Sequence, residues 1–291
     1  MDPTLRELTV FVTAADLGSF TEAAAQLHIS QAAVSRTVAA LEHQVGERLL
    51  RRIPRGCEPT PLGHQLLPQA RRVLAEVERF ADVARRRHST LRLGYSWAAL
   101  GRHTASLHRI WASRHDSIDL ELVRHNSATA GLAEGRCDVA IMRRPVDEQR
   151  FAQAIVGLEE RLVAFATDDP QWSRRRRLSM AEIADRTVFI DSRVGSTTEA
   201  LWHGIGPSPR FVESTDVDHW LDAIAAGRGV GTTAAATAEH HPRHGVTYRP
   251  VNDGPRIPVW LVWWRDAPPT GLPELVDTVT RLYATRAGVV P

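Results

Sequence analysis

The chain has 291 residues, of which 43% are hydrophobic, and a formal net charge of only +2. This length supports a sizeable core and two or three domains, and the small net charge provides no overall field that would indicate a nucleic-acid partner. The two cysteines, Cys57 and Cys137, lie far apart outside any motif, which argues against a disulfide scaffold and indicates a reduced, cytoplasmic protein. We find neither an N-terminal apolar segment nor an apolar run of about twenty residues, so we expect neither secretion nor membrane spanning.

An amphipathic helix is predicted over residues 4–16, and two shorter helices follow it. Ser19 and Glu22 have the spacing of a capping box at the start of the second helix, and Ser30 can cap the third. The apolar faces of the first and third helices are formed by Leu5, Leu8, Phe11, Val12 and Ala15 and by Val34, Val38, Leu41 and Val45. Two short helices joined by a tight turn, the second with a polar outer face, are typical of a helix-turn-helix.

Residues 47–60 predict two short strands around a turn at Pro54 and Gly56. Four arginines gather in this hairpin, within reach of phosphates or a minor groove: Arg48, Arg51, Arg52 and Arg55. The alternative is a small helical bundle with a solvated basic loop.

The segment from Gly18 to Gly63 resembles the winged helix-turn-helix of the LysR-type transcriptional regulators. The matching positions are Ser19-Phe20, Ala23-Ala24, Leu27, Ser30-Gln31, Val34-Ser35-Arg36, Leu41-Glu42, Gly46, Leu49-Leu50, Arg52, Thr60 and Gly63. The similarity continues more weakly along the whole chain. It implies a cytoplasmic regulator without catalytic activity or cofactor, whose partners are double-stranded promoter or operator DNA and a small-molecule effector.

The resemblance also implies roles for individual residues at the DNA. Near the start of the third helix, Ser30, Gln31, Ala32 and Ser35 would lie in the major groove, with the last three at base edges, and Arg36 would contact a phosphate. Arg52 and Arg55 would reach the adjacent backbone or minor groove from the wing, and Thr60 could hold a phosphate.

A long helix is predicted from Pro61 to about Arg87, with Pro68 as an early interruption. Its apolar residues repeat with heptad spacing: Leu66, Ala70, Val73, Val77, Phe80 and Ala84. This stripe could pack on the second half of the same chain. The family resemblance favours an antiparallel pair of such helices in a homodimer, which can assemble further into a homotetramer.

Beyond a boundary at residues 85–90, strands and helices alternate, which predicts an α/β fold with a mostly parallel sheet. Strands are predicted at 91–95, 118–122, 139–142, 151–156, 187–190 and 230–233, and helices at 99–114, 127–134, 196–203, 216–226 and 272–286. Residues 161–167 and 257–264 would cross between two lobes. This arrangement resembles the periplasmic-binding-protein-like effector domain of the same family. The expected domains are 1–60, 61–88 and 89–291, with lobe I at about 89–160 and 265–291 and lobe II at about 161–264.

Ligands of such sheets bind outside the carboxyl ends of strands, beside helix N-termini. Candidate effector-binding residues at these positions, which match the cleft loops of the family, are Ser96, Trp97, Asn126, Ser127, Arg143, Arg193, Ser196, Thr197 and Thr215. Two arginines from opposite lobes would suit a small organic anion, although each hydroxyl could simply cap a helix. Trp97 and Trp202 could form an apolar wall or belong to the core. Thr232 and Thr233 stand where the family has a Leu-Pro-like pair, and could add hydroxyls to the cleft floor.

Other motifs are weak. The segment 227–231 lacks the spacing of a dinucleotide fingerprint, and no P-loop or hydrolase motif is present. His240, His241 and His244 could gather around a metal, but Pro242 and a loop setting favour solvated side chains, and the run 174–177 is interpreted as a solvated surface. The rival hypothesis is a small-molecule enzyme or solute-binding protein that uses the two-lobed domain alone.

Overall fold

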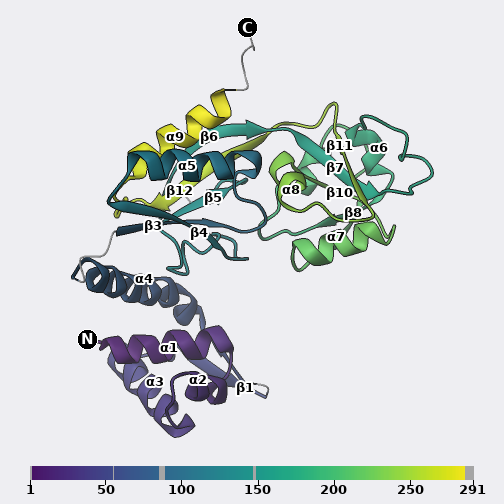
Figure 1. Cartoon of the computed structure of the whole chain (residues 1–291). Coiled ribbons are helices and arrows are strands. Elements are labelled where there is room, and N and C mark those ends of the chain that lie inside the picture. Colours follow the sequence, from purple (N-terminus) through teal and green to yellow (C-terminus); the bar gives the residue numbers. More distant parts are fainter. Residues whose placement is uncertain (1, 55, 85–88, 147–148, 286–291) are drawn as a thin grey trace. The chain divides into compact units, whose positions relative to one another are not determined.

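The computed structural model describes residues 2–54, 56–84, 89–146 and 149–285 (Figure 1). The chain divides into two compact units, with the division at Ser89 and Thr90. Each unit has a hydrophobic core of its own. In the described part of the chain, no helix combines the length and the apolar character that a membrane crossing requires.

The first unit is a winged helix-turn-helix followed by a long helix, which confirms the elements expected for residues 4–84. Its elements are α1 (Leu5–Leu17), α2 (Phe20–Gln26), α3 (Gln31–Val45), the antiparallel strands β1 (Leu50–Ile53) and β2 (Gly56–Pro59), and α4 (Pro61–Ala84). Ser19 and Ser30 cap α2 and α3 by accepting hydrogen bonds from Glu22 N and Ala33 N. The capping box expected at Ser19 and Glu22 is only half formed, because the Glu22 side chain makes no return bond to the amide of Ser19. A complete capping box is formed by Thr4 and Glu7 at α1.

The core of this unit lies between α1, α3 and the start of α4. Val34, Val38 and Leu41 are buried as the helical spacing predicts. On α1 the buried residues are Val10, Phe11 and Ala14, whereas Leu5 remains 45% exposed, so the predicted face is rotated toward Val10. Burial of these side chains, rather than helix propensity, supplies most of the stability of such short helices.

The wing is held to the helices by backbone contacts. The Glu42 carboxylate on α3 accepts hydrogen bonds from the amides of Leu49 and Leu50 at the start of β1 (2.8 and 3.0 Å). The amide of Cys57 on β2 donates to the carbonyl of Gly18 (2.7 Å). A side chain at Gly56 would collide with that same carbonyl, so this turn requires glycine.

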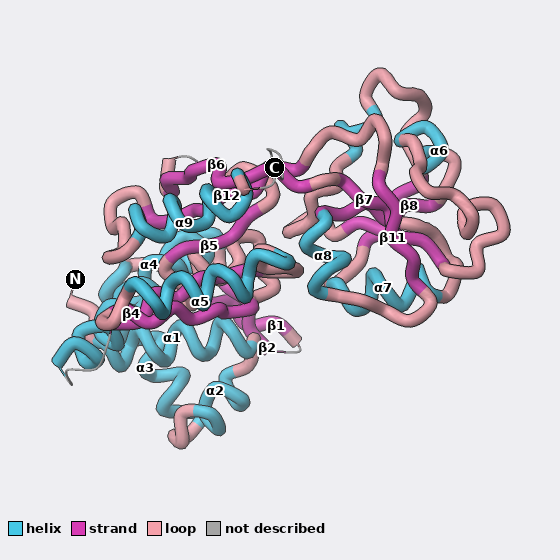
Figure 2. The backbone as a smooth tube through the Cα atoms, turned by 45° about the horizontal axis from the view of Figure 1, so that its top comes forward, coloured by secondary structure: helices cyan, strands magenta, loops and turns pink. Residues whose placement is uncertain are grey.

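The second unit consists of two lobes, which Figure 2 shows as two groups of strands joined through β6 and β7. Lobe I is a five-stranded sheet in the order β4-β3-β5-β12-β6, and α5 and α9 pack against its hydrophobic cluster. Its elements are β3 (Ser89–Tyr95), η1 (Gly101–His103), α5 (Thr104–Arg114), β4 (Ile118–Arg124), β5 (Val139–Met142), β6 (Phe151–Glu159), β12 (Ile257–Trp264) and α9 (Leu272–Ala284).

Lobe II contains a three-stranded sheet in the order β10-β7-β11 and the strand pair β8-β9. Its elements are β7 (Arg161–Ala166), α6 (Met180–Ala184), β8 (Thr187–Ile190), η2 (Glu199–Trp202), β9 (Arg210–Glu213), α7 (Val217–Ala225), β10 (Gly231–Ala234), α8 (Ala235–His240) and β11 (Val246–Pro250). Two hydrophobic clusters fill the lobe, around Phe165 and around Trp220.

The α/β class is confirmed, but the mostly parallel sheet is wrong. β3 and β5 are parallel with Leu93 opposite Val139, whereas β12 runs antiparallel to both β5 and β6. In lobe II, β7 is antiparallel to β10 and β11. The chain leaves lobe I through β6 and returns through β12, and a strand that re-enters a sheet from the far lobe runs against its neighbours.

Three further expectations are corrected. Residues 127–134 form turns instead of a helix, because Ala130 and Gly131 both have positive φ values (52° and 94°) that a helix cannot contain. The helix expected at 196–203 is only the 3₁₀ segment Glu199–Trp202. β12 belongs to the sheet of lobe I, so the return to this lobe precedes Ile257 and does not wait until residue 265.

Candidate functional sites

The start of α3 presents polar side chains to solvent. Ser30 caps the helix, and Gln31, Ala32 and Arg36 are exposed, while the opposite face of the helix is buried. Ser35 is half-buried on the same polar face. A helix with a buried apolar stripe and an exposed N-terminal polar face can enter a major groove.

Arg52 on the wing lies beside this helix. Its Nη2 donates a hydrogen bond to Ser35 Oγ (2.9 Å), and its guanidinium lies 5.4 Å from the centre of the Phe20 ring. Arg51 forms an ion pair with Glu58 on the paired strand, and Arg55 lies outside the described residues. One exposed wing cation is therefore already oriented by the helix that would read the bases.

The Thr60 hydroxyl makes two hydrogen bonds within the protein. It donates to the carbonyl of Arg48 (2.8 Å) and accepts from the amide of Gly63 (3.0 Å) at the start of α4. The hydroxyl therefore links the wing to α4, and the expected phosphate contact would require the protein to give up part of this link.

The apolar stripe on α4 divides into two parts. Leu66 and Ala70 pack against the core of the first unit. Val73, Val77 and Phe80 are 44%, 40% and 75% exposed, and the side chain of Ala84 lies outside those described. Exposed apolar residues in one helical stripe are typical of an interaction surface.

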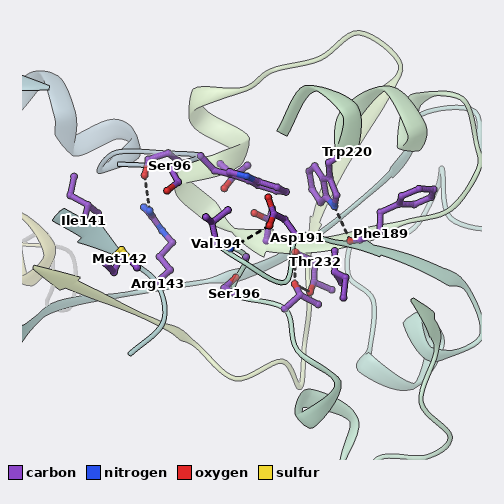
Figure 3. A pocket seen from close by; sticks show the side chains of 17 residues that line it. Ser96, Ile141, Met142, Arg143, Phe189, Asp191, Val194, Ser196, Trp220 and Thr232 are labelled. Carbon is purple, nitrogen blue, oxygen red and sulfur yellow. Dashed lines mark hydrogen bonds between the residues drawn. The ribbon is translucent and has the colours of Figure 1, made fainter. Parts of the chain in front are cut away.

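The second unit contains a pocket between its lobes, with a cavity volume of about 40 Å³ (Figure 3). Its lining from lobe I comprises Ser96, Trp97, Ala98, Ile141, Met142 and Arg143. Its lining from lobe II comprises Phe189, Ile190, Asp191, Val194, Gly195, Ser196, Thr197, Trp220, Thr232, Thr233 and Thr237. The pocket brings together five of the effector-binding candidates: Ser96, Trp97, Arg143, Ser196 and Thr197. It is also lined by Thr232 and Thr233, which were expected to add hydroxyls to the cleft floor.

Arg143 lines this pocket, but its hydrogen bonds are made within the protein. It forms two bonds to the Glu159 carboxylate, both 2.9 Å, and donates to the carbonyls of Ala98 (2.7 Å) and Ala99 (2.6 Å). Tyr283 donates to the same carboxylate (2.5 Å). Burial lowers the pKa of Arg143, but Glu159 outweighs this effect and holds the pKa above its ordinary value.

The other predicted residues lie away from the pocket lining. Arg193 pairs with Asp191 (3.2 Å) and donates to the carbonyl of Thr215, to which Asn126 Nδ2 also donates (3.1 Å). Ser127 accepts from the amide of Gly131 (3.0 Å). Trp202 is 1% exposed in the core of lobe II, where its Nε1 donates to the carbonyl of Met180. The expected arginine clamp and the Trp202 wall are therefore corrected: Arg193 does not line the pocket, and Trp202 is a core residue.

Several lining residues were not identified from the sequence. Asp191 directly follows β8, so the strand-end rule that selected Arg193 could have found it. Trp220 comes from α7, a helix that was expected from the sequence without a role in the pocket. Thr237 comes from α8, a helix that was not expected from the sequence. Glu159 carries no local signal, because its partner Arg143 is sixteen residues away, directly after β5.

An exposed helix-turn-helix with a basic wing, joined to a two-lobed α/β unit with an inter-lobe pocket, defines a DNA-binding regulator that responds to a small molecule. Similarity to known protein families identifies the family. Residues 5–64 match the model of the bacterial regulatory helix-turn-helix proteins of the lysR family, and residues 84–283 match the LysR substrate binding domain. The chain belongs to the LysR family of DNA-binding transcriptional regulators, whose members are not enzymes.

Relatives match over nearly the whole chain. The transcriptional regulator BudR of Raoultella terrigena is 33% identical over 90% of this chain and 94% of its own. BenM of Acinetobacter baylyi is 25% identical over 96% of both chains. The solved structure of the regulator CbnR covers 96% of this chain and 99% of its own, with 21% identity and a TM-score of 0.69. CbnR in complex with its target DNA gives 22% identity over the same shares and a TM-score of 0.66.

Proposed function

We propose that α3 binds in the major groove of a duplex operator, with Gln31, Ala32 and Ser35 at base edges and Arg36 and Arg52 at phosphates. The observation that carries this proposal is the position of Arg52, which the Ser35 hydroxyl holds beside the exposed start of α3. Phosphate contacts fix the register of a protein on DNA, and base contacts select the sequence. The likeness of the fold to CbnR, solved with its target DNA, supports this docking.

The domain bounds and cellular location follow from this assignment. Residues 1–60 form the DNA-binding domain, 61–88 the linker helix, and 89–291 the effector-binding domain. A regulator of operator DNA works in the bacterial cytoplasm, where that DNA lies. The stripe of Val73, Val77 and Phe80 pairs with a second linker helix, because these exposed side chains have helical spacing and no core of their own to enter.

The effector binds in the pocket between the lobes, where Ser96, Trp97, Ser196 and Thr197 line one cavity. A ligand there can shift the equilibrium between two lobe arrangements by the difference in its affinity for them. Asn126, Ser127 and Thr215 support the rim through their contacts with neighbouring backbone.

The DNA-binding proposal is tested by comparing Gln31→Ala with Arg52→Ala. Loss of a base contact costs about 1–3 kcal/mol and relaxes preference at one position of each half-site. Loss of a phosphate contact weakens specific and scrambled duplexes alike, and makes the slope of log K against log salt about one unit shallower per contact. Binding is measured at several salt concentrations, with His43→Ala, at the exposed far end of α3, as control. Unchanged base preference in Gln31→Ala would contradict the placement of α3.

A further inference from the structure

The charged side chains of the pocket neutralise one another. Arg143 and Glu159 are 11% and 5% exposed and form a bidentate ion pair, which leaves Arg143 with one of its five N–H donors. Asp191 has a fully buried carboxylate that accepts hydrogen bonds from Arg193 and from the amide of Val194 (3.4 Å). A charged ligand would lose its hydration here without gaining an unpaired charge of opposite sign.

One donor in the pocket wall has no acceptor. The Nε1 atom of Trp97 is buried and meets no hydrogen-bond partner among the described residues. The indoles of Trp111, Trp202 and Trp220 each donate to a backbone carbonyl, at 2.7, 3.1 and 2.9 Å. The ring of Trp97 packs against Trp220 with centroids 5.3 Å apart. Buried N–H groups are nearly always paired, so Trp97 Nε1 is a donor still open to an acceptor. In this arrangement of the lobes the atom is closed off from the cavity, and a ligand oxygen reaches it only when the lobes move apart.

Hydroxyls complete the polar part of the lining. Ser96 already donates to two carbonyls, and Thr197 is bonded to Thr232. By contrast, the hydroxyls of Ser196, Thr233 and Thr237 have no hydrogen bond within the described part of the chain. A hydroxyl can donate or accept, so these three groups suit a neutral ligand that carries both kinds of polar atom.

We infer that this pocket binds a small uncharged effector with a carbonyl or amide oxygen that accepts from Trp97 Nε1, while its remaining polar atoms meet the free hydroxyls of lobe II. The apolar lining from Ile141, Met142 and Phe189 binds the carbon skeleton when the lobes move apart, because the cavity of about 40 Å³ is smaller than such a ligand. The inference rests on the proposed function, in which this cavity is the effector site. It replaces the organic anion expected from the sequence, because the structure gives the two arginines to Glu159 and Asp191.

The test uses probes that share a skeleton and differ in charge. The full-length protein is titrated with acetate and acetamide, with succinate and succinamide, and with benzoate, benzamide and benzylamine, and affinities are measured by calorimetry. We expect an amide to bind at least about tenfold more tightly than its matched acid, and benzylamine to bind no better than the acid. Trp97→Phe, which keeps the ring and removes the donor, should weaken the bound amide by about tenfold, as loss of one hydrogen bond predicts.

Two further variants control this experiment. Trp260→Phe removes another unpaired buried indole N–H, which lies outside the pocket, and should leave amide affinity unchanged. Thr233→Val removes one free hydroxyl with little change in shape and should weaken the amide about threefold to tenfold. If Trp97→Phe fails to fold, Thr233→Val alone decides the assignment.

The outcomes separate this inference from the proposed function. Tighter binding of an acid or of benzylamine, equal amide affinity in Trp97→Phe and wild type, or no binding by any probe would each overturn the uncharged-effector assignment. Operator binding by the same preparations would then leave the regulator assignment standing. If the wild type itself showed no sequence-specific binding to duplex DNA, that result would instead contradict the proposed function.

Discussion

The DNA-binding surface and the effector pocket hold their functional side chains in opposite ways. On α3 the polar residues are exposed and are positioned by contacts that are close in sequence. Ser30 caps the helix at the amide of Ala33, three residues away, and Arg52 on the wing donates to Ser35, seventeen residues away. In the pocket, the carbonyls of Ala98 and Ala99 bind Arg143 across forty-five and forty-four residues, and the carbonyl of Trp97 contacts His241 across 144. The first surface is built locally, and the second depends on the whole second unit.

This difference decides what a charge can do. Arg36 and Arg52 are exposed and keep their charge available for a phosphate, although solvent and salt weaken each contact. Arg143 is buried, and a buried cation without a carboxylate is strongly unfavourable. Its charge is therefore used in the ion pair with Glu159 and is not available to a ligand. An arginine at a strand end therefore indicates an anion site only when the fold leaves it unpaired.

The largest expected effect comes from removing the carboxylate that pairs with Arg143. Glu159→Gln leaves the guanidinium buried without a counter-charge, and we expect a loss of about 3–5 kcal/mol in the free energy of unfolding of the second unit. All eight tryptophans follow residue 96, so tryptophan fluorescence in urea reports on this unit alone. Glu160→Gln, at the exposed neighbouring position, is the control and should change stability by less than about 0.5 kcal/mol. Similar losses in both variants would show that Arg143 does not depend on Glu159.

The same contrast explains what could be predicted from the sequence. The first unit was predicted nearly completely, because Ser19, Ser30 and the stripe through Val34 and Leu41 act within one or two turns of chain. The positions of Ser96, Trp97 and Ser196 at strand ends and helix starts could also be identified. The partner of Arg143 could not, since Glu159 reaches it only after the sheet forms. Asp191, in contrast, lies two residues before Arg193, and the same strand-end rule could have identified it. The apolar stripe on α4 was also predicted from the sequence. Its exposed part is the reason for proposing a partner helix.

A second test concerns the exposed part of α4, where an apolar surface would be buried only by another copy of the chain. Replacing Val73 and Val77 with aspartate places charges in the proposed helix pair. The dissociation constant of the dimer should therefore rise at least about tenfold. Sedimentation measures the shift toward a smaller species, which should bind half-sites poorly. Glu78→Arg changes an exposed charge on another face of the same helix and should leave the oligomer intact. An unchanged oligomer in the double variant would argue against this seam.

A third test follows the ion pair through pH. Burial raises the pKa of Glu159, but Arg143 and the Tyr283 hydroxyl outweigh this and hold the pKa below its ordinary value. The resulting stability is present above the unfolded-state pKa of about 4.3, and it is lost as the pH falls through the lower folded-state value. The difference in unfolding free energy between wild type and Glu159→Gln should therefore shrink below about pH 4, by at most about 1.4 kcal/mol per pH unit. A difference that stays constant down to pH 3 would contradict this assignment of the proton.

The smallest effect is expected at the contact that joins recognition helix and wing. If the Ser35 hydroxyl mainly orients Arg52, Ser35→Ala frees the guanidinium, and ordering it again on the DNA should weaken specific and scrambled duplexes alike by about twofold to fivefold. In the Arg52→Ala background the same substitution should then have little further effect, because the contact is already gone. If Ser35 instead contacts a base edge, Ser35→Ala will relax the base preference at one operator position. Its loss of binding free energy will then add fully to the loss caused by Arg52→Ala. Competition binding with single-position operator variants distinguishes the two, and additivity would show that the wing and the helix bind DNA independently.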